Sequence, residues 1–160
     1  RLHAERPQVN DAFLERFLNK VFQDDLMVEV FHHMHLPKGL PPVLADQQAL
    51  EQALDNLVVN ALDAMPSGGT LTVAAMRREG GIELRISDTG VGIAPDDLDR
   101  VFLPFYSTKR TGLGVGLPLV RRTIERLGGQ LRLSSVQGKG TTFSILLGVA
   151  GNGPVTGTVG

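Results

Sequence analysis

Residues 54–65, LDNLVVNALDAM, restrict the fold of this chain more than any other stretch. Apolar residues recur there at the spacing of a buried helix face, yet Asn56 and Asn60 stand four positions apart. Asparagine is a poor residue for a helix interior and is costly to bury without partners. Residues i and i+4 share one face of a helix, so both amides point the same way. Either these are two solvent-facing positions of an amphipathic helix, or something polar covers that face.

The periodicity of the remaining chain predicts an α+β fold. Helices and strands segregate rather than alternate strictly, which favours one mixed sheet with helices on one face. The proline-rich residues 36–46 are expected to form a connection without regular structure. We expect helices over residues 11–22, 47–65 and 116–127, a short helix near 95–100, and strands over 26–35, 70–77, 82–87, 130–135 and 141–147.

Composition places the chain among ordinary soluble domains. Its 160 residues are 42% hydrophobic and 21% charged, with a net charge of -1, so nothing advertises nucleic acid or an anionic membrane as a partner. Cysteine is absent, which excludes disulfides and thiolate metal sites. No apolar run approaches the length of a membrane helix. We expect one domain over residues 1–147, without direct membrane contact, and a flexible glycine-rich tail over 148–160.

Asp88 ends the expected strand over residues 82–87 on the strand's buried side, because it continues the alternation of apolar residues there. A buried carboxylate is costly unless it accepts hydrogen bonds. It can bond the backbone of its own turn, as Asp-Thr-Gly permits. Alternatively it accepts from a ligand amine, and Gly90 and Gly92 let that ligand come close.

The stretch GLGVGLPL carries Gly112, Gly114 and Gly116 just before a helix with Pro118 in its first turn. Exposed backbone N–H groups and the helix dipole make such a terminus a phosphate site. The spacing differs from that of dinucleotide-binding and P-loop motifs. A plain flexible hinge is the other interpretation.

The segment over residues 100–126 is locally basic in a nearly neutral chain. Its helical part is compatible with a solvated face. Lys109 and Arg110 differ, because they lie in the glycine-flanked loop and could swing onto a polyphosphate. Phe102 and Phe105 are expected to anchor that loop by burying their rings beneath it.

The cluster HHMH suggests a metal site at first sight. Strand alternation puts His33 and His35 on one face, and His32 with Met34 on the other. Two imidazoles without a neighbouring acid make a poor metal site.

Five motifs in order over residues 8–147 resemble the catalytic, ATP-binding domain of sensor histidine kinases, within the GHKL ATPase superfamily. LDNLVVNALDAM resembles the N box, SDTGVGI the first glycine box, FLPFYSTK the F box, GLGVGL the second glycine box and GKGTTF a third glycine motif. The resemblance implies the Bergerat fold, a two-layer α/β sandwich with a mixed sheet and ATP beneath a mobile lid.

The resemblance also implies roles for individual residues. Asp88 would accept from the adenine amino group, Thr141 would support the adenine end, and Asn60 would hold Mg²⁺ with Asn56 beside it. The catalytic set would be Asn56, Asn60, Lys109 and Arg110. The implied nucleotide site comprises Asn60, Asp88, Gly90, Gly92, Ile93, Phe105, Thr108, Lys109, Gly112, Leu113, Gly114, Val115, Gly116, Leu117 and Thr141.

Asn56 bears on the reaction. In hydrolysing members of the superfamily, a Glu at the matching position acts as general base on water. An amide cannot abstract a proton, so the resemblance implies transfer of the γ-phosphoryl group to a supplied histidine rather than hydrolysis. The alternatives are an ATPase clamp of the gyrase or chaperone type, and a non-catalytic nucleotide-dependent interaction module.

Two positions depart from the pattern of many relatives. Asp63 stands where they carry a basic residue, so the γ-phosphate would depend on Mg²⁺ with Lys109 or Arg110. Leu113 stands where a hydroxyl residue is common, so backbone N–H groups would have more phosphate contacts to make.

No histidine here lies in the family's phosphoacceptor motif. The dimerisation and phosphoacceptor helices are therefore expected before Arg1, in a homodimeric parent protein. The resemblance implies a response regulator receiver domain as the second partner. It also implies a cytoplasmic location for this domain, and leaves membrane anchoring of the parent open.

Overall fold

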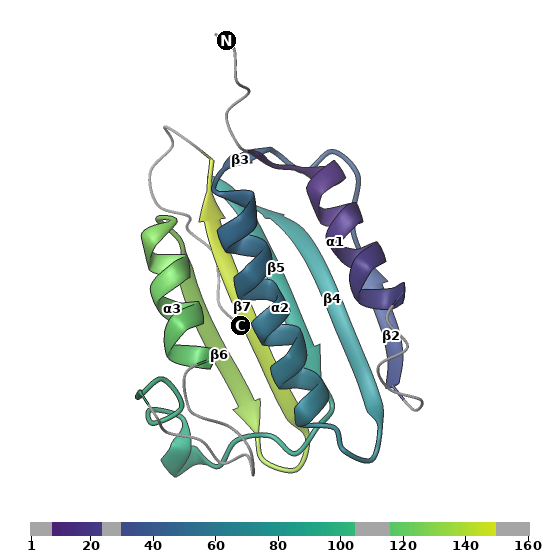
Figure 1. Cartoon of the computed structure of the whole chain (residues 1–160), viewed down its shortest axis with the longest axis vertical. Helices are drawn as coiled ribbons and strands as arrows, with labels where there is room; N and C mark the ends of the chain where they lie inside the picture. The colour runs from purple at the N-terminus through teal and green to yellow at the C-terminus, as the bar shows by residue number, and fades with distance from the viewer. Residues whose placement is uncertain (1–7, 24–29, 105–115, 150–160) are drawn as a thin grey trace, which may run out of the picture.

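A computed structural model describes residues 8–23, 30–104 and 116–149, and shows three helices over one face of a five-stranded sheet (Figure 1). The strand order is β2-β4-β5-β7-β6; β2 runs parallel to β4, and the other neighbours are antiparallel. The elements are β1 (Gln8–Val9), α1 (Asp11–Gln23), β2 (Val30–His35), β3 (Val43–Leu44), α2 (Gln47–Asp63), β4 (Gly69–Arg78), β5 (Gly81–Asp88), the 3-10 turn η1 (Pro95–Asp97), α3 (Gly116–Arg126), β6 (Gln130–Val136) and β7 (Gly140–Gly148).

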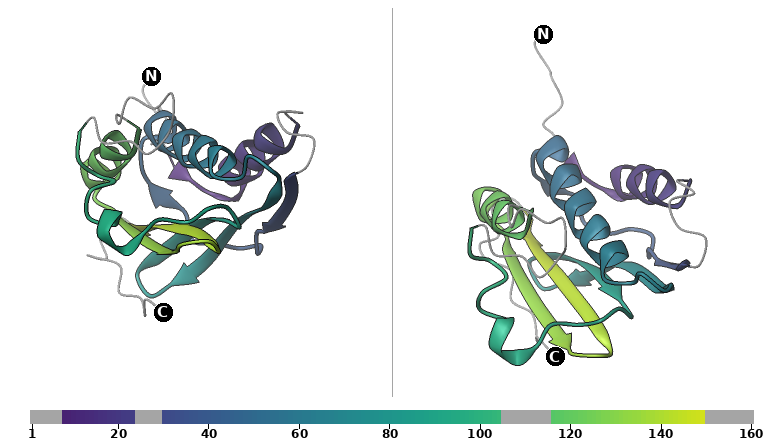
Figure 2. Two further views of the ribbon diagram at one scale, coloured as in Figure 1. Left: turned by 90° about the horizontal axis from the view of Figure 1, so that it is seen from below. Right: turned by 60° about the horizontal axis from the view of Figure 1, so that its bottom comes forward.

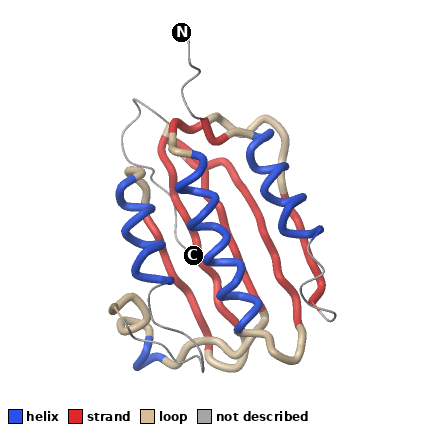
Figure 3. Tube along the Cα trace, in the orientation of Figure 1, coloured by secondary structure: helices blue, strands red, loops and turns tan. Residues whose placement is uncertain are grey.

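The two layers are plain in Figure 2, where the helices lie on one side of the strands, and in the helix and strand colours of Figure 3. The predicted α+β class, with a mixed sheet covered on one face, is confirmed. Alternation along the strands explains this arrangement, because every second residue of a strand faces the same side. The buried hydrophobic residues that follow this alternation in the three central strands are Leu71, Val73, Ala75, Ile82, Leu84, Ile86, Phe143, Ile145 and Leu147.

The helix α2 lies in the middle of the helical layer, between α1 and α3 (Figure 1). It starts where the Asp46 carboxylate accepts from the amides of Gln48 and Ala49, at 3.0 and 3.2 Å. It ends at Asp63, two residues before the predicted end, because Ala64 already serves as its C-cap. Its core face consists of Leu50, Ala53, Leu54, Leu57, Val58 and Ala61.

Three local features differ from the predictions. The connection over residues 36–46 contains β3, which pairs antiparallel with β1 and buries Val9 and Val43. The short helix expected near residues 95–100 is a single 3-10 turn at Pro95–Asp97. β7 continues to Gly148, one residue beyond the predicted end of this strand, and the next residue, Val149, donates its amide hydrogen to Gly80 O at 2.7 Å.

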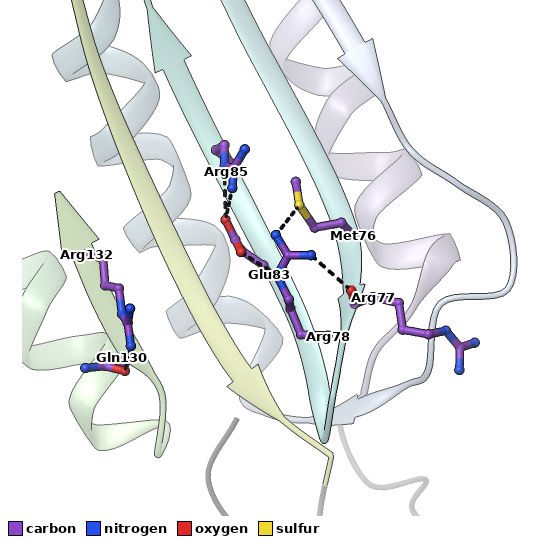
Figure 4. Close-up of polar contacts among 7 residues, drawn as sticks. All are labelled: Met76, Arg77, Arg78, Glu83, Arg85, Gln130 and Arg132. Atoms are coloured by element: carbon purple, nitrogen blue, oxygen red, sulfur yellow. Dashed lines mark hydrogen bonds and ion pairs between the residues drawn. The ribbon is translucent and has the colours of Figure 1, made fainter. Parts of the chain in front are cut away.

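The face of the sheet without helices carries a charge cluster (Figure 4). Glu83 is only 5% exposed there, and its two oxygens pair with Arg78 Nε at 2.8 Å and with an Arg85 guanidinium nitrogen at 2.7 Å. Burial alone would raise the pKa of Glu83. The hydrogen bonds and charges of Arg85 and then Arg78 outweigh burial, so the pKa of Glu83 is lowered.

Across the described ranges, no helix combines the length and the apolar character needed to cross a lipid bilayer.

Candidate functional site

Three polar side chains form a row across the ends of β5, β7 and β6. Asp88 lies directly opposite Thr141 in the β5–β7 ladder, and Ser135 lies opposite Thr141 in the β6–β7 ladder. Each lies two residues from an apolar residue that faces the helices, and residues i and i+2 of a strand share one face, so the row lies on the helix-covered face. Asp88 is 7% exposed and Thr141 is 5% exposed. The row therefore brings together a buried carboxylate, a buried hydroxyl and the half-buried hydroxyl of Ser135.

Asp88 makes the turn bond that its sequence context predicted. Its Oδ1 accepts from the Gly90 amide at 2.8 Å. This bond does not exclude the ligand interpretation, because a carboxylate offers about four lone-pair sites. The buried placement of Asp88 is confirmed by its exposure.

The loop that follows β5 is fixed on one side to the end of α2. The Val91 amide donates to Ala64 O at 2.9 Å. A Cβ on Gly90 would lie 2.2 Å from the same carbonyl oxygen. Gly90 is therefore required for close packing of the loop against α2.

The other side of this loop is fixed to the β6–β7 turn. The Gly138 amide donates to Val91 O at 2.7 Å. Gly92 has a φ of +71°, and a Cβ there would lie 2.2 Å from Val136 O. The protein's own backbone fills the Cβ positions of Gly90 and Gly92, so packing alone requires both glycines. Whether they also let a ligand come close stays a prediction.

Ser135 is a site residue that the sequence analysis missed. Its hydroxyl accepts from the Ile93 amide at 2.8 Å, donates to Gly140 O at 3.0 Å, and lies 2.8 Å from Thr141 Oγ1. One side chain thereby connects the loop after β5, the β6–β7 turn and Thr141. A single serine in a strand carries no periodic signal, and only the strand register reveals its partners.

Ion pairs from Lys20 of α1 identify the flank of α2 that faces α1. Its ammonium pairs with Glu51 at 3.3 Å and with Asp55 at 3.0 Å. The hydrogen bond that Lys20 donates to Asp55 is the main cause of a raised pKa of Lys20.

The asparagines of α2 lie on its other flank. A helix turns 100° per residue, so Asn56 and Asn60 point roughly 140° away from the pair formed by Glu51 and Asp55. Both asparagines are half-buried. Since α3 lies on the side of α2 away from α1 (Figure 1), the asparagine flank faces α3. The opening pattern of the sequence is therefore a polar flank between two helices, not a solvent-facing surface.

The start of α3 lies beside the same flank. Gly116 is exposed with open space around its Cβ position, and Leu117 packs against the core. Arg121 lies over the ring of Phe102 at 5.1 Å, and Phe102 packs against the core. The loop that Phe102 is predicted to anchor lies outside the described residues.

The remaining predicted site residues lie outside the described residues, in 105–115, where the lid was expected. They are Phe105, Thr108, Lys109, Arg110, Gly112, Leu113, Gly114 and Val115.

No group of three or more His, Asp or Glu residues within the described ranges could hold a metal ion. The backbone register of β2 places His33 opposite Thr72 and His35 opposite Ala74 in the parallel ladder with β4. Of the predicted site, the structure thus describes Asn56, Asn60, Asp88, Gly90, Gly92, Ile93, Gly116, Leu117 and Thr141.

A known protein family matches the part of the chain that carries this geometry. The family model for histidine kinase-, DNA gyrase B- and HSP90-like ATPases matches residues 45–151, from the N-cap region of α2 to just past the end of β7. The chain belongs to this family. Membership confirms the resemblance drawn from the five motifs, and it covers every described element of the candidate site.

Within this ATPase family, the relatives are sensor histidine kinases. Sensor histidine kinase ZraS of Escherichia coli strain K12 is 35% identical over 139 residues, which cover 87% of this chain and 30% of that protein. The structure of a mycobacterial sensor histidine kinase, MprB, is 28% identical with a TM-score of 0.75, and covers 91% of this chain and 99% of that one.

A third comparison is the structure of full-length ShkA in complex with AMPPNP. It is 27% identical with a TM-score of 0.75, over 88% of this chain and 31% of that one. The chain spans about a third of the length of the curated relatives it matches.

Proposed function

We propose that this ATPase-family domain binds ATP with Mg²⁺ and supplies the γ-phosphoryl group to a histidine on a separate phosphoacceptor domain. The observation that carries the proposal is the buried Asp88 directly opposite Thr141 at the end of the sheet. A buried carboxylate suits a ligand amine, such as the exocyclic amine of adenine. The AMPPNP complex of ShkA supports a nucleotide as the ligand of this fold.

The base would lie against the row of strand ends, and the phosphates against the other half of the site. The base would contact the carboxylate of Asp88 and the hydroxyl of Thr141. It would also contact the loop after β5, which is attached on two sides and contains Gly90, Gly92 and Ile93. The first turn of α3 carries N–H groups without helical partners, which suits phosphate. Phe105, Thr108, Lys109 and the run Gly112, Leu113, Gly114, Val115, Gly116 and Leu117 would complete the proposed phosphate side.

Asn60 is the proposed metal ligand, with Asn56 beside it on the flank that faces α3. An amide oxygen is a suitable ligand for Mg²⁺ when phosphates and waters supply the rest. Mg²⁺, when bound, would neutralise charge on the β- and γ-phosphates. Lys109 and Arg110 are proposed to do the same from the loop.

Asn56 favours transfer over hydrolysis, because an amide cannot take a proton from water. Phosphoryl transfer depends mostly on positioning and charge stabilisation. In the proposed reaction the γ-phosphoryl group leaves ADP and joins an imidazole nitrogen of the acceptor. This chain would hold ATP in the right geometry, and it would offer no general base at position 56 to activate water.

The chain spans about a third of its curated relatives, so its partners are also proposals. We propose dimerisation and phosphoacceptor helices elsewhere in the parent protein, a homodimeric parent, and a response regulator receiver domain as the final acceptor. A cytoplasmic location of this domain belongs to the same proposal, as does a single domain that is followed by a glycine-rich tail.

Phosphorus NMR of ATP, followed over hours with stoichiometric protein with and without Mg²⁺, tests this function. We expect perturbed ATP signals that depend on Mg²⁺, and little free phosphate. Perturbed signals with steady phosphate growth would instead support an ATPase clamp of the gyrase type. Unperturbed signals would contradict nucleotide binding by this chain.

A further inference from the structure

We propose that Ser135 is a positioning residue that fixes which base the site accepts, by holding the hydroxyl proton of Thr141. Thr141 and Asp88 would then present only hydrogen-bond acceptors to the ligand. This inference rests on the proposed function, because it assumes that a nucleotide base lies against these two residues.

The argument starts from proton counting at Ser135. A serine hydroxyl has one hydrogen and two acceptor lone pairs. The Ile93 amide can only donate, so its 2.8 Å bond takes one lone pair of Ser135 Oγ. Gly140 O can only accept, so the 3.0 Å bond to it takes the hydrogen of Ser135. In the remaining 2.8 Å contact, Thr141 must therefore be the donor and Ser135 the acceptor.

The backbone keeps this arrangement in place. The loop that carries Ile93 is fixed at Val91 to both Ala64 and Gly138. The turn that carries Gly140 lies tightly against β5, since a Cβ on Gly140 would lie 2.0 Å from Asp88 O. Neither partner of Ser135 can move away without breaking other contacts, and a partly buried carbonyl or amide left unpaired is costly.

The position of this hydrogen decides which hydrogen bonds Thr141 can make with a ligand. Once its hydrogen points to Ser135, its oxygen has only lone pairs to offer. Thr141 lies directly opposite Asp88, and such cross-strand pairs have Cβ atoms about 4.5–5.5 Å apart. A base that presents an amine between these acceptors can donate to them. A base that presents a carbonyl oxygen there meets lone pairs on both sides.

Inosine triphosphate is the probe for this effect. It keeps the ribose and the phosphates of ATP, but it carries a carbonyl in place of the 6-amino group and a hydrogen on N1. Because both nucleotides are compared in each variant, a change in their ratio reports the change at Thr141. Calorimetric affinities of the 160-residue chain for ATP and for inosine triphosphate give a selectivity ratio. We expect Ser135→Ala to lower this ratio about tenfold, roughly one hydrogen bond, because the freed Thr141 hydroxyl can donate to the carbonyl.

Ser134→Ala is the matched control. Ser134 is exposed and points to the opposite face of β6, so its removal should leave both affinities unchanged. Ser135→Thr keeps a hydroxyl in the strand and should retain the wild-type ratio. A purely structural role of Ser135 would weaken both nucleotides equally and leave the ratio unchanged.

A double-mutant cycle with Thr141→Val separates the proton relay from effects on the loop. Thr141→Val keeps the side-chain shape, and on its own it should also lower the ratio. In that background, Ser135→Ala should have no further effect on the ratio.

Two outcomes would overturn the inference: a wild-type ratio in Ser135→Ala, or a ratio change that persists when Thr141 is Val. Both leave nucleotide binding intact. Failure of the wild-type chain to bind ATP would instead overturn the proposed function itself.

Discussion

Asp88 accepts from the Gly90 amide through Oδ1 while it remains 7% exposed. Asp88→Asn would keep an oxygen for that bond and put an NH₂ donor at the other position. A donor facing a ligand amine leaves both unpaired, so we expect ATP affinity to fall about 100-fold with little change in melting temperature. Calorimetric titration and thermal melting by circular dichroism check the two expectations. Wild-type affinity in the folded variant would remove Asp88 from base recognition.

Asn56 allows a test of the choice between transfer and hydrolysis. Asn56→Glu would introduce a general base on the flank of α2 that faces α3. General bases contribute about 100-fold or more to such reactions, so even a poorly placed one should raise the rate of phosphate release on the order of tenfold. Gln52→Glu, which adds the same charge to an exposed position of α2, is the control. An equal effect of both variants would assign the change to charge alone.

The loop between β5 and the 3-10 turn is hydrogen-bonded both to the end of α2 and to the β6–β7 turn. In Gly92→Ala, the added Cβ would lie 2.2 Å from Val136 O at a φ of +71°. We expect a loss of about 1–3 kcal/mol in the free energy of unfolding, measured with urea. Gly116→Ala, with nothing near its Cβ, should leave stability unchanged or slightly raised. Equal stability of both variants would contradict the tight packing described for this loop.

The β4–β5 hairpin carries a stabilising charge cluster whose contribution depends on pH. Because the pKa of Glu83 is lowered on folding, its contribution is complete above the ordinary glutamate pKa of about 4.3 and is lost as pH falls through the lower folded value. Glu83→Gln should therefore lose about 1–2 kcal/mol of stability at pH 7. This difference should shrink below about pH 4.

Urea denaturation of the Glu83→Gln variant at pH 7 and pH 3 measures the difference. Glu79→Gln, at an exposed position in the same hairpin, should match the wild type at both pH values. A stability difference that is the same at both pH values would show that charge on Glu83 does not cause it.

At the scale of the whole molecule, the end of the folded domain can be tested by truncation. Gly148 pairs with Gly81, and Val149 donates to Gly80 O and packs against the core. A chain that ends at Val149 should keep the wild-type melting temperature. One that ends at Leu147 should melt several degrees lower, about what a loss of 1–2 kcal/mol gives at this size. Equal melting of the two chains would contradict a structural role for residues 148 and 149.

Local periodicity explains what the sequence could predict about the fold. The helix over Gln47–Asp63 and the strands of the central sheet each bury a regular set of apolar residues, so their type and approximate bounds follow from spacing. β1 and β3 are two residues long each, too short for any period. The parallel pairing of β2 with β4 joins distant segments, and no local pattern encodes it.

Local pattern also decides which residues of the candidate site the sequence could predict. Asp88 and the two asparagines were predictable because each breaks a local apolar pattern. Ser135 breaks none, since a polar residue in a strand predicts only its face. Its partners come from strand register, which requires the assembled sheet, and the same holds for Glu83 on the other face of the sheet.

The double attachment of the loop after β5 also limits how the chain can change in length. Between Asp88 and Ile93, the chain is hydrogen-bonded to Ala64, Gly138 and Ser135. These partners lie at the end of α2, in the β6–β7 turn and in β6. Inserting or deleting one residue there would break at least one attachment and displace the buried carboxylate. Evolution of this domain should therefore tolerate insertions elsewhere on its surface while the number of residues between Asp88 and Ile93 stays constant.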